Sequence, residues 1–263
     1  MIDLRALRAD AARALGEVMD GFRPGASTEE LLRQHDAVSL HLHTIAVACL
    51  LVDGDAQKLF LNLTRCAENG LLFLKLLRRR ALPLPAASKN VPLLAALAAG
   101  DFERAAAISV ASRDDRDEEG REYETEFLWA RALQLLAAPR ADAAAVEPIL
   151  ARLVELDPGA YADRAGAVRA LLAGDAAAFE EAIAGAALAY EQVTEARARS
   201  FTTPVTTFAP HRFVWLEGLA LLRLGERAGL RVERELKYCP RLARVPMTAH
   251  YDGDWAIELG GAG

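Results

Sequence analysis

The sequence predicts an all-α protein built as an irregular stack of antiparallel helical hairpins with an extended C-terminal tail. Alanine and leucine, which both favour helix, dominate a chain of 263 residues in which 52% of side chains are hydrophobic. The apolar stretches are separated mostly by Gly-Asp pairs, prolines, serines and threonines, the residues that begin and end helices. No Ser/Gly-rich linker divides the chain, so we expect a single helical domain over residues 1–263.

The apolar periodicity predicts ten helices. Their ranges are 3–20, 28–52, 55–80, 91–99, 102–112, 119–137, 144–155, 158–173, 176–200 and 211–228. Residues 27–30 (STEE) form a capping box, in which Ser27 is expected to bond the amide of Glu30 while the Glu30 side chain reaches back. Asp157 before Pro158 places a cap ahead of a proline at the first helical position.

An internal pattern predicts three tight corners between helices. Gly54-Asp55, Gly100-Asp101 and Gly174-Asp175 each follow an apolar helix end. Glycine suits the left-handed position after a helix, and aspartate can cap the helix that follows. The corners lie 46 and 74 residues apart, and this unequal spacing argues against a regular solenoid while allowing irregularly stacked hairpins.

The sequence offers little support for strands. Residues 201–208 (FTTPVTTF) are β-prone, but Pro204 makes them a loop or an edge piece at best. After Gly229 the apolar residues become scattered and prolines stand at positions 240 and 246. Residues 230–259 therefore predict an extended tail that wraps the last helices, with at most one short strand.

Charge and composition restrict the expected partners and location. A formal net charge of −6 does not favour nucleic acid, because phosphate binding needs a basic face. No uninterrupted apolar run reaches the length of a membrane span and the amino terminus has no signal-peptide core, so we expect no membrane partner and a cytoplasmic location. Cys49, Cys66 and Cys239 lack CxxC spacing and are expected to be reduced thiols that behave as small hydrophobes.

The sequence carries no recognisable catalytic or cofactor motif. Nucleophile signatures, phosphate-binding glycine loops and Glu-x-x-His pairs are missing. His41 and His43 are two residues apart and point to different helix faces, so we interpret them, with His35, as surface or partly buried side chains. We therefore predict that the protein is not an enzyme and has no metal and no cofactor.

An unfamiliar helical active site stays open as an alternative to this prediction. His211 follows Pro210 at an expected helix start and is interpreted as structural, and His250 lies in the tail beside an acid. The residues that would form such a site are His211, Arg212, His250 and Asp252.

Two charged clusters stand out. Residues 78–80 are three arginines that close an expected helix, where cations favour the C-terminal end of the dipole. Residues 114–126 hold eight acids and two arginines, a balance of −6 that equals the whole-chain value. This acidic segment is either a solvated loop with an acid-rich helix start or a docking patch for a basic partner. The candidate partner-binding residues are Asp114, Asp115, Asp117, Glu118, Glu119 and Glu122.

The carboxy-terminal stretch 210–255 has a recurring form, in which an apolar helix ends in RAGLRVE (residues 227–233) and a proline-punctuated tail follows. Helix pairs around residues 91–108 and 167–183, and the helix around residues 59–77, accompany it. Together these segments resemble immunity protein family 49 of bacterial polymorphic toxin systems. The resemblance implies an all-α fold, no enzymatic activity, and neutralisation of a toxin by binding.

Two function hypotheses follow. The first is an immunity protein that binds a cognate toxin domain, expected to be basic, and occludes the toxin's active site. The acidic segment would form the interface, with residues 201–208 or the tail as the other candidate surfaces. The alternative is a tetratricopeptide-like helical adaptor for protein–protein interaction, which also needs no catalytic residues but which the unequal corner spacing disfavours. No pattern in the sequence predicts an oligomeric state.

Overall fold

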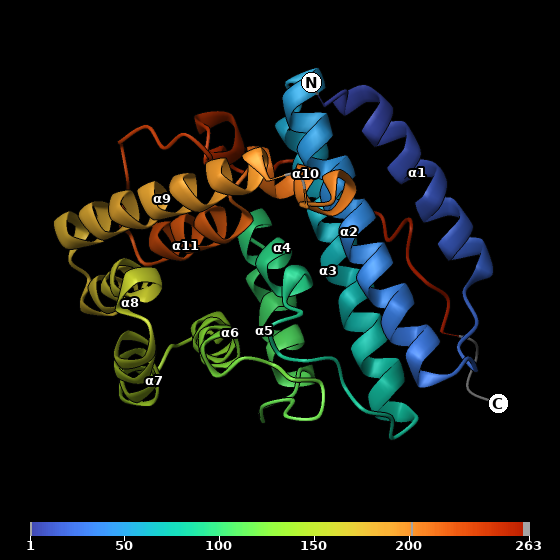
Figure 1. Ribbon diagram of the computed structural model, residues 1–263, viewed down its shortest axis with the longest axis horizontal. Coiled ribbons are helices and arrows are strands. Elements are labelled where there is room, and N and C mark those ends of the chain that lie inside the picture. The colour runs from blue at the N-terminus through green and yellow to red at the C-terminus, as the bar shows by residue number, and fades with distance from the viewer. Residues whose placement is uncertain (1, 201, 260–263) are drawn as a thin grey trace.

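In the computed structural model, which describes residues 2–200 and 202–259, helices supply all of the regular secondary structure of the described residues (Figure 1). Helices make up 70% of the structure, roughly twice the share typical of globular proteins, so the all-α prediction is confirmed. The elements are α1 (Leu4–Gly21), α2 (Thr28–Asp53), α3 (Ala56–Arg79), α4 (Val91–Ala99), α5 (Phe102–Ala111), α6 (Glu124–Ala137), α7 (Ala143–Leu156), α8 (Pro158–Ala173), α9 (Ala176–Arg199), α10 (Val205–Phe213), α11 (Leu216–Arg227) and the 3-10 helix η1 (Arg241–Arg244).

The helices pack mainly on their sequence neighbours until the chain turns back. Helices α1, α2 and α3 lie side by side at one end, α4 and α5 pack on α3, and α6 to α9 extend the stack (Figure 1). Helix α11 then packs on α4, and α10 packs on α2. One cluster of buried apolar side chains runs from Leu15 in α1 to Ile257 in the tail. The prediction of one domain stays a prediction, and this continuous core supports it.

The three Gly-Asp corners form as predicted. Gly54, Gly100 and Gly174 take the left-handed conformation, with φ of 66°, 79° and 72°. The aspartate that follows each glycine accepts a hydrogen bond from a backbone amide in the first turn of the next helix. Asp157 likewise caps α8 by accepting from the amide of Ala160. Local capping chemistry therefore sets these helix boundaries.

Replacing Gly100 or Gly174 by valine should lower the free energy of unfolding by about 1–2 kcal/mol, because a Cβ is disfavoured at positive φ. Denaturant titration measures the change. Gly16→Val is the matched control, since Gly16 is helical in α1 and no atom lies within 4 Å of its ideal Cβ. The expectation would be contradicted if Gly100→Val and Gly174→Val had the same denaturation midpoint as the control and the parent chain.

Two predicted boundaries are wrong, and a contact between residues remote in sequence accompanies each of them. Helix α6 begins at Glu124 rather than at 119, because Arg121 has a positive φ and the Glu122 carboxylate is held by the remote amide of Ser88 and by that of Asp117. The region predicted as one helix over 211–228 contains two, α10 and α11, separated by the extended residues Val214 and Trp215. The amide of Trp215 there donates to the carbonyl of Tyr238 in the tail.

The β-prone stretch contributes to a helix instead of a loop or an edge piece. Pro204 occupies the N-cap position of α10, with a φ of −64°, and Val205 to Phe208 form the first turns. Phe201 lies outside the described residues. The capping box at the start of α2 is half formed: Ser27 accepts from the amide of Glu30, whereas the Glu30 carboxylate binds Arg33 and Gln34.

Helix α2 is long and apolar enough to cross a membrane by length and composition, with a mean hydropathy of 1.4 over its most apolar window. The sequence expectation missed it because isolated polar residues interrupt its apolar runs. In the structure 61% of that window is buried, and α2 packs between α1 and α3. A buried core helix passes the same test of length and composition, so the finding is weak support for a membrane span.

The extended tail after α11 is confirmed, and its first part packs on α9 and α11 as predicted. Its last part goes further than predicted and runs along α3, where side chains of α3 bind its backbone. Gln57 donates to the carbonyl of Pro246 and accepts from the amides of Thr248 and Ala249. Asn69 bonds the carbonyl of Trp255 and the amide of Ile257. The described part of the tail contains no strand.

The three arginines at the end of α3 connect segments that are remote in sequence. Arg78 donates to the carbonyls of Ala111 and Ser112, at the end of α5. Arg80 donates to two carbonyls of the α1–α2 connection, and Arg79 donates to the carbonyl of Leu259 in the tail. Their role therefore extends beyond the helix dipole that the sequence indicated.

Candidate functional site

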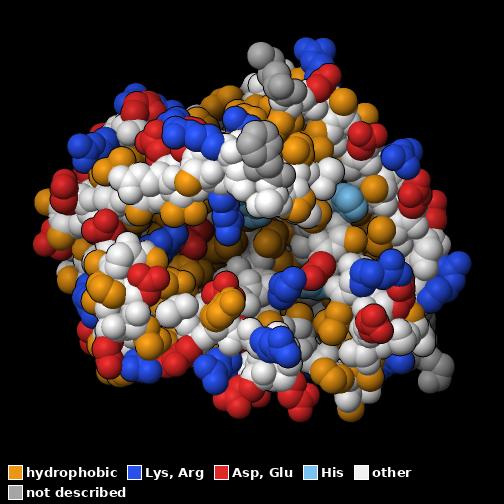
Figure 2. All heavy atoms as spheres, in the orientation of Figure 1, with side chains coloured by type: hydrophobic (Ala, Val, Ile, Leu, Met, Phe, Trp, Pro, Cys, Tyr) orange, Lys and Arg blue, Asp and Glu red, His pale blue; other side chains and the backbone are white. Residues whose placement is uncertain are grey.

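The acidic segment begins in an exposed loop between α5 and α6, residues 112–123, which we call the acidic loop. Figure 2 shows acidic side chains at the lower edge of the molecule, below α5 and α6. Asp114, Asp115, Glu118 and Glu119 are exposed there. Four of the six candidate residues are therefore presented to solvent on one short connection.

Arginines neutralise part of this charge. Arg113 binds Asp115 at 3.0 Å and Asp117 at 3.3 Å, and Arg116 binds Glu118 at 2.8 Å. Hydrogen bonding to Arg113 lowers the pKa of the Asp115 carboxyl below its ordinary value. Among the described residues, Asp114 and Glu119 have no ion-pair partner. The unpaired negative charge of the loop is therefore smaller than the sequence count indicates.

Two of the candidate residues hold the loop together instead of facing solvent. Glu122 is 8% exposed, and its carboxylate accepts from the amide of Ser88 at 2.7 Å and from that of Asp117 at 3.0 Å. Asp117 is half-buried and accepts from the amide of Gly120. The contact with Ser88 spans 34 residues, so no local signal distinguished Glu122 from its exposed neighbours.

Two exposed apolar side chains flank the acidic loop in sequence. Val110 precedes the loop near the end of α5, and Tyr123 is its last residue, the N-cap of α6. Protein interfaces are enriched in tyrosine, and a tyrosine combines a large apolar face with a hydroxyl. Charge alone marks this segment in the sequence, and charge gives no indication of Tyr123.

The structure does not bring together the four residues of the alternative active site. His211 lies in α10 with its ring 4.9 Å from that of His43, centroid to centroid. His250 pairs with Asp252 in the exposed tail and lines a different pocket. Within the described residues, no cluster of three histidine, cysteine or acidic side chains could hold a metal ion.

The interpretation of the α2 histidines as surface or partly buried was wrong for two of them. His35 is 3% and His43 1% exposed, because α10 and the segment before α4 cover this part of α2. Burial, together with His211, lowers the pKa of His43 well below its ordinary value. The Nε2 atom of His43 has no hydrogen-bond partner in the described structure. A neutral, buried imidazole of this kind belongs to the α2–α10 packing.

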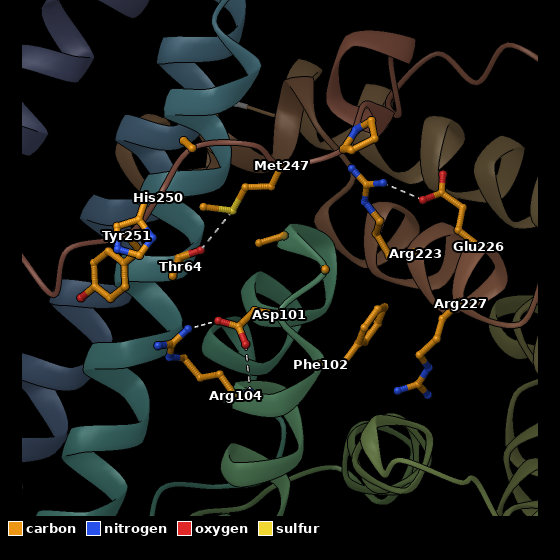
Figure 3. Close-up of a pocket in the computed structure, with 14 residues that line it drawn as sticks. Thr64, Asp101, Phe102, Arg104, Arg223, Glu226, Arg227, Met247, His250 and Tyr251 are labelled. Carbon is orange, nitrogen blue, oxygen red and sulfur yellow. Dashed lines mark hydrogen bonds and ion pairs between the residues drawn. The ribbon is translucent and has the colours of Figure 1, made fainter.

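A cleft lies between α3, the α4–α5 corner, α11 and the tail, with a volume of about 550 Å³ (Figure 3). Arg104 extends from α5 and pairs with Asp101 and with Glu68. Arg223 and Arg227 extend from α11 on the opposite side, and His250 and Tyr251 come from the tail (Figure 3). The charged side chains in this cleft are mainly guanidinium groups, which bind anions but do not serve as nucleophiles.

A further polar cluster that the sequence did not reveal joins three helices. The Glu217 carboxylate of α11 accepts from Arg164 of α8 at 2.7 Å and from the indole of Trp129 of α6 at 2.8 Å. Both charged side chains are largely buried, at 17% exposed for Arg164 and 18% for Glu217. Because the pair connects helices remote in sequence, no spacing rule could have found it.

The three cysteines are free and buried, as expected for reduced thiols packed as small hydrophobes. Burial raises the pKa of the Cys66 thiol to about 12. Thiol reactivity requires an accessible thiolate, so none of these positions has the environment of a reactive cysteine.

The comparison with protein families identifies the chain. The model of the family described as immunity protein 49 matches residues 86–243, more than half of the chain. The match contains the segments 91–108 and 167–183, and part of 210–255, on which the resemblance was based; the segment 59–77 lies outside it. No curated protein and no solved structure matches the chain. The chain therefore belongs to the immunity protein 49 family.

Proposed function

We propose that this protein binds a cognate bacterial toxin and neutralises it by occluding the toxin's active site. Membership of an immunity protein family carries the proposal, since such a family implies a toxin as partner in general. The family also suggests a non-enzymatic role. Occlusion requires only binding, and it fits a chain in which four candidate catalytic residues lie apart.

We place the toxin interface on the acidic loop, with Asp114, Asp115, Glu118 and Glu119 as its charged residues. These side chains are exposed on a connection that is internally braced by Glu122, so the loop can present them in a fixed arrangement. Clustered acids accelerate association with a basic surface and fix its orientation. Tyr123 offers an apolar contact beside them. The expected partner is thus a basic toxin domain.

The adaptor alternative is disfavoured by how the chain closes on itself. In a tetratricopeptide-like solenoid each repeat contacts only its neighbours and leaves an open concave surface. Here α11 packs on α4, and the tail binds α3 through contacts that span about 190 residues. These contacts bring the last elements of the chain back onto α3 and α4, which a solenoid of neighbour-only contacts does not do, so the adaptor has little support.

Reversing Asp114, Asp115, Glu118 and Glu119 to lysine tests this interface. The partner to test is the product of the neighbouring gene, and the measurements are association rate, salt dependence and protection of cells that express that product. We expect binding and protection to fall sharply. Thermal stability should hardly change, because exposed charges contribute little to folding.

A control variant with the same change in charge separates a local effect from net charge. It replaces four exposed acids outside the loop, Asp10, Asp20, Glu29 and Glu181, by lysine. If the association rate falls by the same factor in both variants, the acidic loop is not the interface. If neither the parent chain nor the control protects cells from the toxin, the proposed neutralisation itself is wrong.

A further inference from the structure

Two adjoining pockets form a single cleft, which we call the arginine cleft. The first is the pocket of about 550 Å³ drawn in Figure 3, between the α4–α5 corner, α11 and the tail. The second, of about 390 Å³, continues between α11 and η1, and both have Arg223, Glu226 and Pro246 in their walls. Volumes of this order are typical of sites for small molecules. The arginine cleft shares no residue with the acidic loop.

The walls of the arginine cleft carry an excess of positive charge, although the whole chain has a net charge of −6. Six arginines and three carboxylates line it. The arginines are Arg104, Arg223, Arg227, Arg231, Arg241 and Arg244, and the acids are Asp101, Glu226 and Glu233. This local excess is opposite in sign to the field of the protein as a whole.

Only half of these guanidinium groups have a counter-ion. Arg104 pairs with Glu68 at 2.7 Å, Arg223 pairs with Glu226 at 2.6 Å, and Arg241 pairs with Glu235. Over residues 2–200 and 202–259, no carboxylate lies within ion-pair distance of the other three, Arg227, Arg231 and Arg244. Glu233, which also lines the cleft, has no ion-pair partner among the described residues and offsets one of these charges, so a net positive charge remains on α11 and the segment that follows it.

Neutral groups orient two of these three arginines without cancelling their charge. The Arg227 guanidinium lies 4.5 Å from the ring centroid of Phe102 and donates to the carbonyl of Leu136. Arg244 donates to the carbonyls of Val232 and Arg234. Burial without a counter-ion lowers the pKa of Arg227 from its ordinary value, although the group stays charged at neutral pH. A partly desolvated cation of this kind gains stability when an anion approaches it.

We propose that the arginine cleft binds a small phosphate-bearing anion with two or more negative charges. The planar fork of a guanidinium matches the oxygens of a phosphate, and arginine is the preferred side chain for such recognition. Three guanidinium groups on neighbouring walls, each without an ion-pair partner among the described residues, favour a polyphosphate over a single carboxylate. Beside them, Met247 and Tyr251 supply apolar surface for an organic group. Inorganic pyrophosphate and a nucleoside triphosphate are the two sources that share this chemistry.

Isothermal titration with pyrophosphate, with adenosine triphosphate and with sodium chloride at matched ionic strength tests the proposal. We expect saturable binding of pyrophosphate by the intact chain. Arg227→Gln and Arg231→Gln should each weaken it by about tenfold, as expected for the loss of one charge-assisted hydrogen bond. Both residues retain substantial solvent exposure, although the Arg227 guanidinium packs on Phe102, so both variants should keep the helical circular dichroism of the parent chain. Tighter binding of the triphosphate would assign a role to its organic part.

Arg5→Gln is the matched control, because Arg5 is an exposed arginine on α1 outside the cleft. It should bind pyrophosphate as the parent chain does. Absence of saturable binding at millimolar pyrophosphate would overturn the proposal. So would binding that falls equally in all three variants, since that result would report net charge and not a site. Neither outcome bears on toxin neutralisation, which the acidic-loop variants test separately.

Discussion

Replacing Glu217 by alanine is expected to lower the free energy of unfolding by about 3 kcal/mol, the lower end of the range for breaking a buried ion pair by removing one partner. The substitution leaves the Arg164 guanidinium in a largely buried position without its carboxylate. It also removes the acceptor of the Trp129 indole N–H. Urea denaturation of the variant and the parent chain measures the difference.

The size of this loss in stability follows from the surroundings of Arg164 once the Glu217 carboxylate is removed. Arg164 keeps one hydrogen bond, to the carbonyl of Ala160, and lies near the rings of Tyr161 and Trp215. Water can reach the guanidinium only in part, so solvation does not replace the lost carboxylate. The pair connects α8 to α11, and Trp129 adds α6, so the effect should also appear as a loss of cooperativity between these helices.

Glu147→Ala is the matched control, because Glu147 of α7 likewise binds an arginine of a neighbouring helix, Arg169 of α8. Those side chains are 52% and 40% exposed, and an exposed pair of this kind contributes at most about 1 kcal/mol. If Glu217→Ala lowers the free energy of unfolding no more than Glu147→Ala does, burial does not determine how much the Arg164–Glu217 pair contributes to stability. The double variant Arg164→Met/Glu217→Leu should recover part of the loss, since no unpaired charge is then buried.

The sequence predicted those features of the fold that depend on a few adjacent residues. Gly100-Asp101 and Gly174-Asp175 determine their corners through the conformation of one glycine and the cap of one aspartate. The start of α8 follows in the same way from Asp157 and Pro158. Such features require no knowledge of the rest of the chain.

The wrong or incomplete predictions share a dependence on distant partners. The break between α10 and α11 is stabilised by a hydrogen bond from Trp215 to Tyr238, and the late start of α6 depends on Glu122 and Ser88. The last part of the tail runs along α3 because Gln57 and Asn69, nearly 200 residues earlier, bind its backbone. None of these contacts has a periodicity or a spacing that a single sequence can reveal.

At the candidate interface, too, the sequence predicted the local feature and missed the contacts that depend on distant residues. Charge counting found the acidic loop, because clustered acids are visible in the sequence. It could not separate Asp114 and Glu119, which are exposed and unpaired in the described structure, from Glu122, which braces the loop. Exposure and hydrogen bonding decide this difference, and both arise only after residues 81–90 and α5 have packed beside the loop.

Asn69→Leu should release the end of the tail and lower the free energy of unfolding by about 2–3 kcal/mol, the cost of leaving buried polar backbone groups unpaired. Asn69 is fully buried, and its side chain donates to the carbonyl of Trp255 at 2.7 Å and accepts from the amide of Ile257 at 2.9 Å. Leucine has a similar size and forms neither bond. The two backbone groups can then regain partners only in water, so residues 254–259 should leave α3 and expose the buried side chain of Ile257.

Hydrogen exchange measured by mass spectrometry tests this expectation, because the amides of the tail should lose protection while those of α9 and α11 keep it. Thr44→Val in α2 is the control: the buried Thr44 hydroxyl donates to the carbonyl of Leu40 within its own helix and forms no bond to the tail. That variant should leave tail protection unchanged. If the tail of Asn69→Leu stays as protected as in the control, apolar packing of Ile257 and the Arg65–Asp254 pair hold it, and the buried carboxamide is dispensable.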